Sequence, residues 1–254
     1  MISVMMQSLN PIVLIPSRMG STRLPNKPLA DIAGFPMIVQ VLRRALEADI
    51  GPVLVACGEK DIFDVVSDAG GDAVLTSPNH NSGSDRIYEA LSKIDVERRF
   101  NVIVNLQGDL PTIDCTCMHA ILEPLQAAAC DISTLVAEII REEEKDNPDV
   151  VKAAVALEEG ARIGRAIYFS RCVIPSGHGP FFHHIGIYAY RRTALESFVK
   201  FSPGVLEVRE RLEQIRALEN GLRIDAALVD TLPLGVDTPA DLARAREILD
   251  KSKN

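Results

Sequence analysis

A strand, a helix and a second strand follow one another near the start of the chain, in the stretches IVLI (Ile12–Ile15), MIVQVLRRALEA (Met37–Ala48) and VLVAC (Val53–Cys57). The two short stretches are continuous apolar runs rich in branched residues, which indicates strands buried on both faces. The stretch between them repeats its apolar side chains at helical spacing. This order predicts a right-handed βαβ unit, and therefore a parallel sheet.

The same alternation continues along the chain and becomes less regular in the second half. Further strand patterns are Ala73–Thr76, Val102–Leu106, Val150–Leu157, Ala166–Ser170, Ile185–Tyr190 and Arg223–Val229. Further helix patterns are Asp61–Ala69, Ser84–Ile94, Glu207–Asn220 and Pro239–Leu249. We expect an α/β fold with a mostly parallel central sheet flanked by helices. No linker rich in Pro, Gly or Ser divides the chain, so we expect a single domain over residues 1–254, with an ordered core at about 10–250.

Composition excludes several classes of protein. Of the 254 residues, 47% are hydrophobic and 24% are charged, which is typical of a globular protein and not of a disordered or fibrous one. The net charge of −8 argues against a nucleic-acid partner. No apolar run approaches the ~20 residues of a membrane span, so we expect no membrane insertion.

The start of the chain and the cysteines favour a cytoplasmic protein. The first fifteen residues lack the basic start of a signal peptide. The five cysteines are odd in number and show no C-x-x-C spacing, which favours reduced thiols. The alternation of Cys115, Cys117 and His119 leaves a metal site as an alternative, although structural zinc sites usually need four ligands.

The segment Pro11–Ala30 carries the strongest functional signal. It contains Arg18, Arg23 and Lys27 and no acidic residue, whereas the rest of the chain is acidic. Ligands of open α/β sheets bind at the carboxyl ends of the strands, where this loop begins. Guanidinium and ammonium groups match phosphate oxygens, so we predict a phosphate-binding loop. A basic solvated loop is the alternative. Neither the P-loop nor the dinucleotide fingerprint occurs.

Two acidic residues follow later strand patterns. Asp109 follows Val102–Leu106 in a Gln-Gly-Asp sequence, and Asp237 precedes the last helix pattern in a Gly-Val-Asp-Thr-Pro sequence. Carboxylates from separate strand ends commonly share Mg²⁺ with a triphosphate. Asp109 is alternatively a turn residue, and Asp237 is alternatively a helix cap.

Six motifs occur in order along the chain: IPSR (15–18), STRLPNKPL (21–29), NSGSDR (81–86), VNLQGD (104–109), HIGIY (184–188) and GVDTP (235–239). Together they resemble the family of 3-deoxy-manno-octulosonate cytidylyltransferases, also called CMP-Kdo synthetases. The resemblance runs from about Ile12 to Leu249. It implies a Rossmann-like nucleotidyltransferase fold with a smaller dimerisation subregion in the second half, and a homodimer. The implied reaction transfers CMP from CTP to the anomeric hydroxyl of 3-deoxy-manno-octulosonate (Kdo). It releases pyrophosphate and forms CMP-Kdo for lipopolysaccharide synthesis.

The resemblance also implies roles for particular residues. The catalytic residues are Arg18, Lys27, Asp109 and Asp237. The nucleotide-binding residues are Arg18, Arg23, Lys27, Ser82, Gly83, Ser84, Arg86 and Asp109. Asp109 and Asp237 hold the cofactor Mg²⁺. The sugar-binding residues are Gln107, Arg171, His184, Tyr188, Glu213 and Gln214.

The chain departs from the family pattern at three places. Asn26 stands where glycine is common, Leu110 stands where glutamate is common, and the stretch Ile174–His183 is shorter than in some members. Asparagine tolerates unusual backbone angles better than most residues, so the first loop can survive its substitution. Two alternatives stay open: a cytidylyltransferase for another acidic sugar, such as an 8-amino Kdo analogue or a sialic acid, and a nucleotide-binding regulatory protein without catalysis.

Overall fold

The computed structural model describes residues 8–21 and 23–251. Thr22 of the STRLPNKPL motif and the two ends of the chain lie outside the described residues. Internal contacts divide the chain into two compact units. Among the described residues, unit 1 contains Ser8, Leu9 and His119–Leu232, and unit 2 contains Asn10–Met118 and residues 233–251. Whether the chain folds as one domain stays a prediction.

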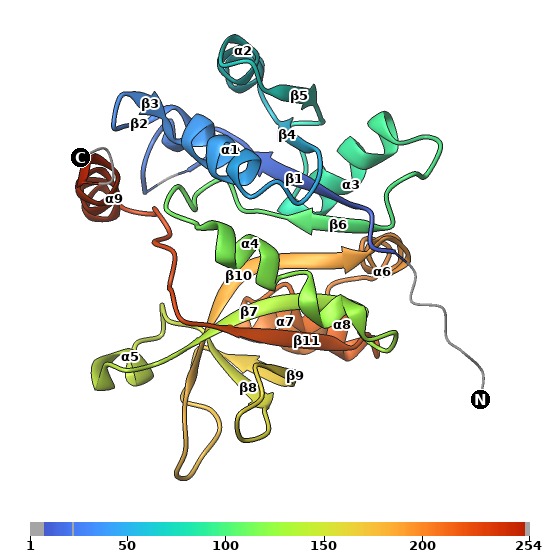
Figure 1. Cartoon of the computed structure of the whole chain (residues 1–254), viewed down its shortest axis with the longest axis vertical. Helices are drawn as coiled ribbons and strands as arrows, with labels where there is room; N and C mark the ends of the chain where they lie inside the picture. Colours follow the sequence, from blue (N-terminus) through green and yellow to red (C-terminus); the bar gives the residue numbers. More distant parts are fainter. Residues whose placement is uncertain (1–7, 22, 252–254) are drawn as a thin grey trace. The chain divides into compact units, whose positions relative to one another are not determined.

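Unit 2 is built on a parallel sheet (Figure 1). Its strands lie in the order β5-β4-β1-β6, and each neighbouring pair is parallel. Their bounds are β1 Pro11–Ser17, β4 Val53–Cys57, β5 Asp72–Leu75 and β6 Val102–Asn105. Helices α1 (Met37–Glu47), α2 (Lys60–Asp68) and α3 (Gly83–Ile94) connect these strands. The predicted strand–helix alternation of the first half is confirmed, with ends shifted by one or two residues.

The order of these strands determines where a ligand can bind. The chain builds outward from β1 to β4 and β5, then returns to place β6 on the other side of β1. Such a reversal opens a crevice outside the carboxyl ends of the two strands at the switch point. Here the crevice lies where β1 and β6 end, at Ser17 and Asn105.

Helix α9 (Pro239–Lys251) returns to the loop after β1 and packs on it. The short elements of this region are η1 (Lys27–Leu29), β2 (Asp31–Ile32) and β3 (Phe35–Pro36). One apolar cluster joins Leu24 and Ile32 from the loop region with Val236, Leu242 and Leu249 from the last segment. Figure 1 shows α9 beside β2 and β3. This packing brings the segment before α9 to the carboxyl end of the parallel sheet.

Unit 1 has a mixed sheet in the order β10-β7-β11-β9-β8, in which only β7 and β11 pair in parallel. The strands are β7 Ile132–Glu138, β8 Lys152–Ala156, β9 Ile163–Ser170, β10 Phe182–Arg191 and β11 Ile224–Val229. The start of β10 also pairs with β8, so the two ends of this sheet meet. The remaining elements of unit 1 are η2 (Glu123–Gln126), α5 (Glu142–Asp146), α6 (Arg192–Phe198), α7 (Val205–Glu210) and α8 (Ile215–Glu219). Helix α4 (Cys115–Ala120) begins in the range of unit 2 and ends in that of unit 1.

The predicted continuous helix Glu207–Asn220 is wrong. The structure has the two short helices α7 and α8 instead, with Arg211 between them in the left-handed region at φ 57°. A buried ion pair explains the break, because the Arg216 guanidinium donates two hydrogen bonds to the Glu207 carboxylate. Residues nine apart on a continuous helix would lie about 13 Å apart along the axis and on opposite sides. The pair therefore forms only if the helix ends and the chain turns.

The α/β fold class is confirmed. Parallel pairing holds throughout the sheet of unit 2, whereas unit 1 is mostly antiparallel and contains β7, a strand that the sequence analysis missed. Among the described residues, no helix combines the length and the apolar character needed to cross a membrane.

Candidate functional site

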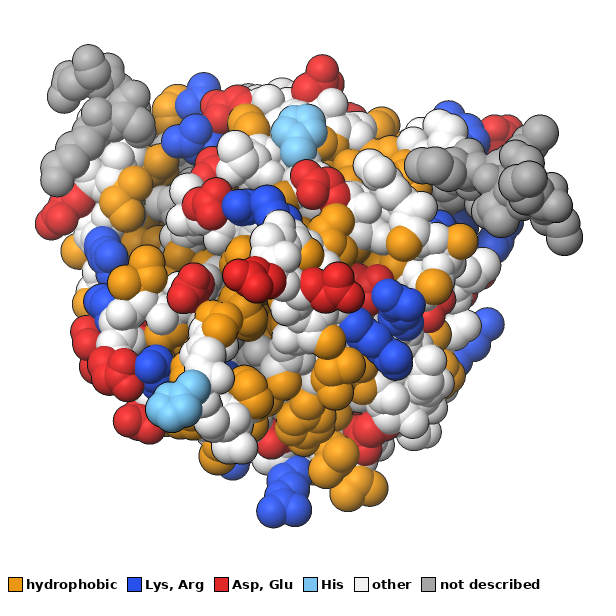
Figure 2. All heavy atoms as spheres, turned by 60° about the horizontal axis from the view of Figure 1, so that its bottom comes forward, with side chains coloured by type: hydrophobic (Ala, Val, Ile, Leu, Met, Phe, Trp, Pro, Cys, Tyr) orange, Lys and Arg blue, Asp and Glu red, His pale blue; other side chains and the backbone are white. Residues whose placement is uncertain are grey.

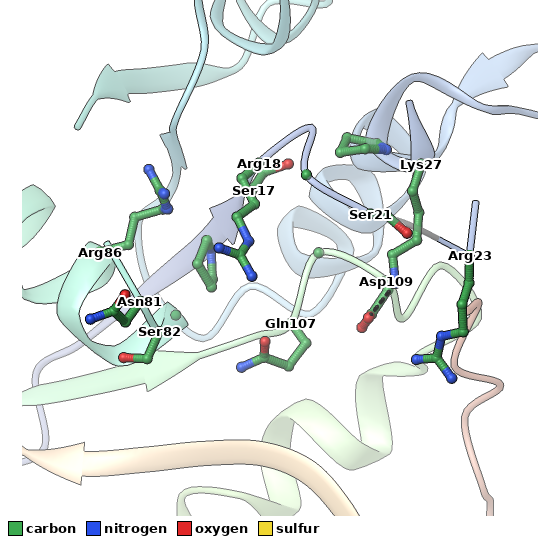
Figure 3. A pocket seen from close by; sticks show the side chains of 15 residues that line it. Ser17, Arg18, Ser21, Arg23, Lys27, Asn81, Ser82, Arg86, Gln107 and Asp109 are labelled. Atoms are coloured by element: carbon green, nitrogen blue, oxygen red, sulfur yellow. Dashed lines mark hydrogen bonds and ion pairs between the residues drawn. The ribbon is translucent and has the colours of Figure 1, made fainter. Parts of the chain in front are cut away.

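A cavity of about 370 Å³ lies at the carboxyl ends of β1 and β6 in unit 2, at the switch point of the sheet (Figure 3). It is lined by Pro16, Ser17, Arg18, Gly20, Ser21, Arg23, Lys27, Pro28, Asn81, Ser82, Gly83, Arg86, Gln107, Gly108 and Asp109. These residues come from the end of β1 and the segment after it up to η1, from the start of α3 with the two residues before it, and from the loop after β6. Four of the lining side chains are cationic and one is acidic, so the cavity favours an anion.

Glycines let the segments around the cavity approach one another. A Cβ atom on Gly108 would lie 2.9 Å from the carbonyl oxygen of Pro16, so only glycine lets the loop after β6 come this close to the end of β1. A Cβ atom on Gly58, directly after β4, would lie 2.9 Å from Nη1 of Arg86. Gly58 thus leaves room for a guanidinium at the base of the cavity.

Arg86 is buried, and part of its guanidinium lacks an acceptor. Its Nη1 atom donates to Thr76 Oγ1 at 2.6 Å and to the carbonyl oxygen of Ser77 at 3.0 Å. Its Nη2 atom and Ser17 Oγ are buried without a hydrogen-bond partner in the described part of the chain. Burial lowers the pKa of Arg86, and the nearby charge of Arg18 lowers it further, although Glu59 opposes this effect. An unmade hydrogen bond at a buried polar group is costly, so both groups suit a ligand rich in acceptors.

Arg18 and Lys27 are held very differently. Arg18 is exposed at the end of β1 and has no hydrogen bond or ion pair to the described residues; Figure 3 shows its side chain pointing into the cavity. Lys27 lies in η1, and its side chain is only 14% exposed. The residue before it, Asn26, is in the left-handed region at φ 55°, so asparagine does provide the backbone conformation that glycine would give more easily.

The Lys27 ammonium joins the two carboxylates that the sequence singled out. Its Nζ atom lies 2.8 Å from Asp109 Oδ2 and 2.8 Å from Asp237 Oδ1. Arg23 adds a second cation, with Nη2 3.0 Å from Asp237 Oδ2. Burial opposes the charge on Lys27, but the attraction and hydrogen bonds of Asp109 and Asp237 outweigh it and raise the Lys27 pKa above its ordinary value.

The Asp237 side chain does not cap α9. Thr238 Oγ1 accepts a hydrogen bond from the Asp241 backbone N–H at 3.2 Å, and the Asp241 carboxylate accepts one from the Thr238 N–H at 2.9 Å. This reciprocal pair is a capping box. The Asp237 carboxylate is thereby left to Lys27 and Arg23, and the helix-cap interpretation of Asp237 is wrong.

These two carboxylates suit a hard cation. Mg²⁺ is usually held by one or two carboxylates, with substrate phosphates and water completing its ligands. Both carboxylates reach one ammonium group, which stands in for a shared cation. Within the described ranges, no three side chains of His, Cys, Asp or Glu converge as a metal site. A cation at Asp109 and Asp237 would thus need further oxygens from a ligand.

The start of α3 forms another wall of the cavity. Ser82 Oγ accepts a hydrogen bond from the Asp85 backbone N–H at 3.1 Å and so caps the helix. Gly83 and Arg86 line the cavity beside it, whereas Ser84 is buried in the same turn and is not a lining residue. Of the predicted nucleotide-binding residues, all except Ser84 therefore line one cavity.

The predicted sugar residues fall in both units. Gln107 lines the cavity of unit 2, whereas the other five lie in unit 1. The rings of His184 and Tyr188 have centroids 5.5 Å apart, and the charge of Glu213 contributes to raising the pKa of Tyr188, after burial and Tyr190. Gln214 directly precedes α8, and its buried Nε2 atom has no partner among the described residues.

His184 is neutral at physiological pH. Burial, together with the neighbouring His183, lowers its pKa to about 3. The Thr134 hydroxyl donates to the carbonyl oxygen of Ile187 at 2.9 Å and lies 3.0 Å from His184 Nε2. His184 can orient a ligand but offers no charge to an anion.

Arg171 is the cationic residue of the predicted sugar set. Its guanidinium donates to the carbonyl oxygens of Glu210 at 3.2 Å and Pro148 at 3.0 Å. Its own carbonyl oxygen accepts a hydrogen bond at 2.6 Å from Lys152, which is fully buried. Burial lowers the pKa of Lys152. These contacts fix Arg171 to β8 and α7 within unit 1.

Sequence reasoning missed the residues that support the cavity. The Glu59 carboxylate accepts a hydrogen bond from the Met19 backbone N–H at 3.0 Å and so holds the first loop. Glu89 holds the opposite loop, since it contacts His80 and Lys93 and accepts from the Ser77 N–H at 2.9 Å. The one available signal was the position of Glu59, which lies two residues after the end of β4, the strand beside β1.

Comparison with known proteins identifies the family. The family model described as cytidylyltransferase matches residues 12–224. The 3-deoxy-manno-octulosonate cytidylyltransferase of Paramagnetospirillum magneticum is 60% identical over 96% of this chain and 99% of its own length. That of Rhodospirillum rubrum is 61% identical over 94% of this chain and 95% of its own. The chain belongs to the 3-deoxy-manno-octulosonate cytidylyltransferase family.

Solved structures agree with this family. The structure of a CMP:2-keto-3-deoxy-manno-octonic acid synthetase complexed with CTP is 35% identical to this chain, with a TM-score of 0.88 over 96% of this chain and 99% of the other. A cytidylyltransferase from Leptospira borgpetersenii is 14% identical and shares the fold, with a TM-score of 0.59 over 96% of this chain and 95% of the other. Like the Kdo cytidylyltransferases it matches, this chain is therefore a nucleotidyltransferase in fold.

Glu89, on α3, should make the free energy of unfolding depend on pH. Burial opposes ionisation of Glu89, but hydrogen bonds from Lys93, the Ser77 backbone and His80 lower its pKa to about 2. Because the pKa is lower in the folded state than in the unfolded state, the ionised group stabilises the fold above about pH 5, and this contribution is lost as the pH falls toward 2. Glu89→Gln should destabilise the protein at pH 7, and the difference from wild type should shrink to roughly half or less at pH 3.

Urea denaturation at the two pH values measures this difference. Glu47→Gln is the control. In the part of the chain that the structure describes, Glu47 forms one ion pair, with Arg44 on the surface of α1, so this substitution should change stability little at either pH. A Glu89→Gln deficit of the same size at pH 7 and pH 3 would contradict the prediction.

Proposed function

We propose that this chain transfers CMP from CTP to Kdo, releasing pyrophosphate and forming CMP-Kdo. One observation carries the proposal: Lys27 joins Asp109 and Asp237 at the edge of a cationic cavity, in a chain about 60% identical to Kdo cytidylyltransferases. A nucleotide-binding protein without catalysis would have no need to keep both carboxylates beside the cations. The name of the relatives supports CMP-Kdo as the product, and hence a place in lipopolysaccharide synthesis.

The triphosphate of CTP would occupy the cavity of unit 2. Arg18, Arg23 and Lys27 supply positive charge from the first loop, and Arg86 supplies a buried guanidinium with a donor to spare. The segment from Ser82 to Arg86 would lie against the cytidine. Both substrates are anions, so this charge must be in place before the two reacting groups can approach.

Asp109 and Asp237 would hold Mg²⁺ beside the triphosphate. When bound, the ion would polarise phosphate oxygens and offset the charge that develops on them. The two carboxylates come from different segments, one after β6 and one before α9, so they can hold a shared ligand from two sides.

The chemistry needs no covalent intermediate on the protein. The anomeric oxygen of Kdo forms a bond to the α-phosphorus of CTP while the bond to the β-phosphate oxygen breaks and pyrophosphate leaves in line. The proton of the anomeric hydroxyl is released in the same reaction. Arg18 and Lys27 would stabilise charge on the non-bridging and leaving oxygens, which is the main means of catalysis in phosphoryl transfer.

Kdo would be held by Gln107, Arg171, His184, Tyr188, Glu213 and Gln214. Because His184 is neutral, Arg171 is the cation of this set for the sugar carboxylate. We also propose that the enzyme works in the cytoplasm; the free thiols of Cys57, Cys117 and Cys130, all buried, support a reducing compartment.

The substrates can be tested with one assay of pyrophosphate release. CTP, UTP, ATP and GTP are each combined with Kdo, its 8-amino analogue and a sialic acid in the presence of Mg²⁺. We expect turnover with CTP and Kdo, at least tenfold above every other combination. Equal turnover with UTP or ATP, or none with any acidic sugar, would refute the proposal, and a preference for another sugar would assign the chain to that acceptor.

Loss of either carboxylate should depress catalysis. Asp109→Asn and Asp237→Asn should each lower kcat by on the order of 100-fold or more, since each removes a charged ligand from a cation that stabilises the transition state. Circular dichroism should show an unchanged fold. Asp230→Asn is a matched control, because Asp230 is exposed and its one ion pair among the described residues is with Arg162. Near-full activity of Asp237→Asn with Mg²⁺ would remove Asp237 from the metal site.

We propose that the protein is a homodimer formed by unit 1. The support is a set of apolar side chains that unit 1 leaves exposed, among them Ile140 at 91%, Val205 at 81% and Val208 at 65%. Figure 2, which brings the bottom of Figure 1 forward, shows hydrophobic side chains gathered among charged ones. Exposed apolar groups of this kind often mark an interface.

Light scattering tests the proposed dimer. At micromolar concentration the measured mass should be about twice the chain mass of 27.7 kDa. Val205→Glu with Val208→Glu should shift the mass toward that of one chain, because a charge would have to be buried. A monomeric wild-type protein would contradict the proposal.

A further inference from the structure

Lys27 occupies the position between Asp109 and Asp237 that a shared cation would take. Its Nζ atom is 2.8 Å from an oxygen of each carboxylate, although the two acids lie 82 and 210 residues further along the chain. Its side chain is 14% exposed, whereas that of Asp237 is 49% exposed. The ammonium is thus enclosed and the carboxylate edge is open to the surroundings.

The charges at this point are balanced without a metal. Asp109 and Asp237 carry two negative charges, and Lys27 and Arg23 carry two positive ones, all in contact. A free divalent cation that entered would face two cations already paired with its ligands. Like charges at such distances repel strongly where water is partly excluded.

A triphosphate changes this balance. It brings negative oxygens into a cavity that Lys27 also lines, and ammonium and phosphate pair readily. If Lys27 turns to a phosphate oxygen, both carboxylates lose their nearest cation. A divalent cation carried by the same triphosphate can then replace it at Asp109 and Asp237.

We propose that Lys27 is a built-in competitor for the metal, so that the site takes a divalent cation together with a nucleoside triphosphate and discriminates against the free ion. This inference rests on the proposed metal role of Asp109 and Asp237. It gives Lys27 a function before the reaction, in addition to any contact with phosphate during it.

Metal binding without nucleotide tests the inference directly. Mn²⁺ is the probe, because the electron paramagnetic resonance signal of the free ion reports the fraction bound without any turnover. Lys27→Met keeps an unbranched side chain of similar length and removes the charge. We expect wild type to bind Mn²⁺ weakly and Lys27→Met to bind it at least tenfold more tightly.

Two further variants show whether the effect is local. Arg18→Met removes a cation of the same loop that contacts neither carboxylate among the described interactions, and its Mn²⁺ affinity should stay within about twofold of wild type. Lys27→Met combined with Asp109→Asn should lose the gain. Circular dichroism checks that each variant is folded.

The proposed competition between Lys27 and the metal is refuted if folded Lys27→Met binds Mn²⁺ no more tightly than wild type. It is also overturned if Arg18→Met gains as much as Lys27→Met, because the effect would then be the general charge of the loop. A wild-type protein active on CTP and Kdo whose Lys27→Met variant gains nothing would refute this inference alone. A gain that depends on Asp109, in a protein inactive on every acidic sugar, would refute the proposed function alone.

Discussion

The ion pairs of Lys27 with Asp109 and Asp237 hold together segments that lie far apart in the sequence. Each of the three residues comes from a different place: the loop after β1, the loop after β6 and the segment before α9. Such a contact needs all three segments in position at once. The apolar cluster of Leu24, Ile32 and α9 provides the driving force, since polar contacts at a half-exposed site contribute little net stability.

The backbone around Lys27, Asp109 and Asp237 also helps to bring these three side chains together. Asn26 accepts a left-handed conformation so that η1 can begin at Lys27, and Gly108 lets the loop after β6 approach Pro16. Thr238 and Asp241 cap α9 between themselves, which leaves Asp237 available. Each feature positions one charged side chain at the same cavity. The left-handed Asn26 positions Lys27, the close approach of Gly108 positions Asp109, and the cap of α9 leaves Asp237 free to face Lys27.

Local patterns predicted the parts of this protein that local forces determine. Continuous apolar runs identified β1, β4 and β6, and the cationic loop after β1 identified one wall of the cavity. The helix over Glu207–Asn220 failed because the deciding contact, between Glu207 and Arg216, is a tertiary ion pair that helical periodicity does not encode. The supports of the cavity, Glu59 and Glu89, were missed for a similar reason: charged residues beside a strand or on a helix look like ordinary surface residues until their partners are known.

Helix α9 belongs to unit 2 but is the last element to be synthesised, and this order affects how the chain folds on the ribosome. The ribosome completes all of His119–Leu232 before it makes Asp237, so the parallel sheet of unit 2 has to wait for its last helix while unit 1 is already available to fold. Until then Leu24 and Ile32 lack the apolar cover of α9, and Lys27 has only one carboxylate partner. A nascent chain therefore carries an unfinished cavity, and Lys27 can reach both carboxylates only after the segment before α9 has been made.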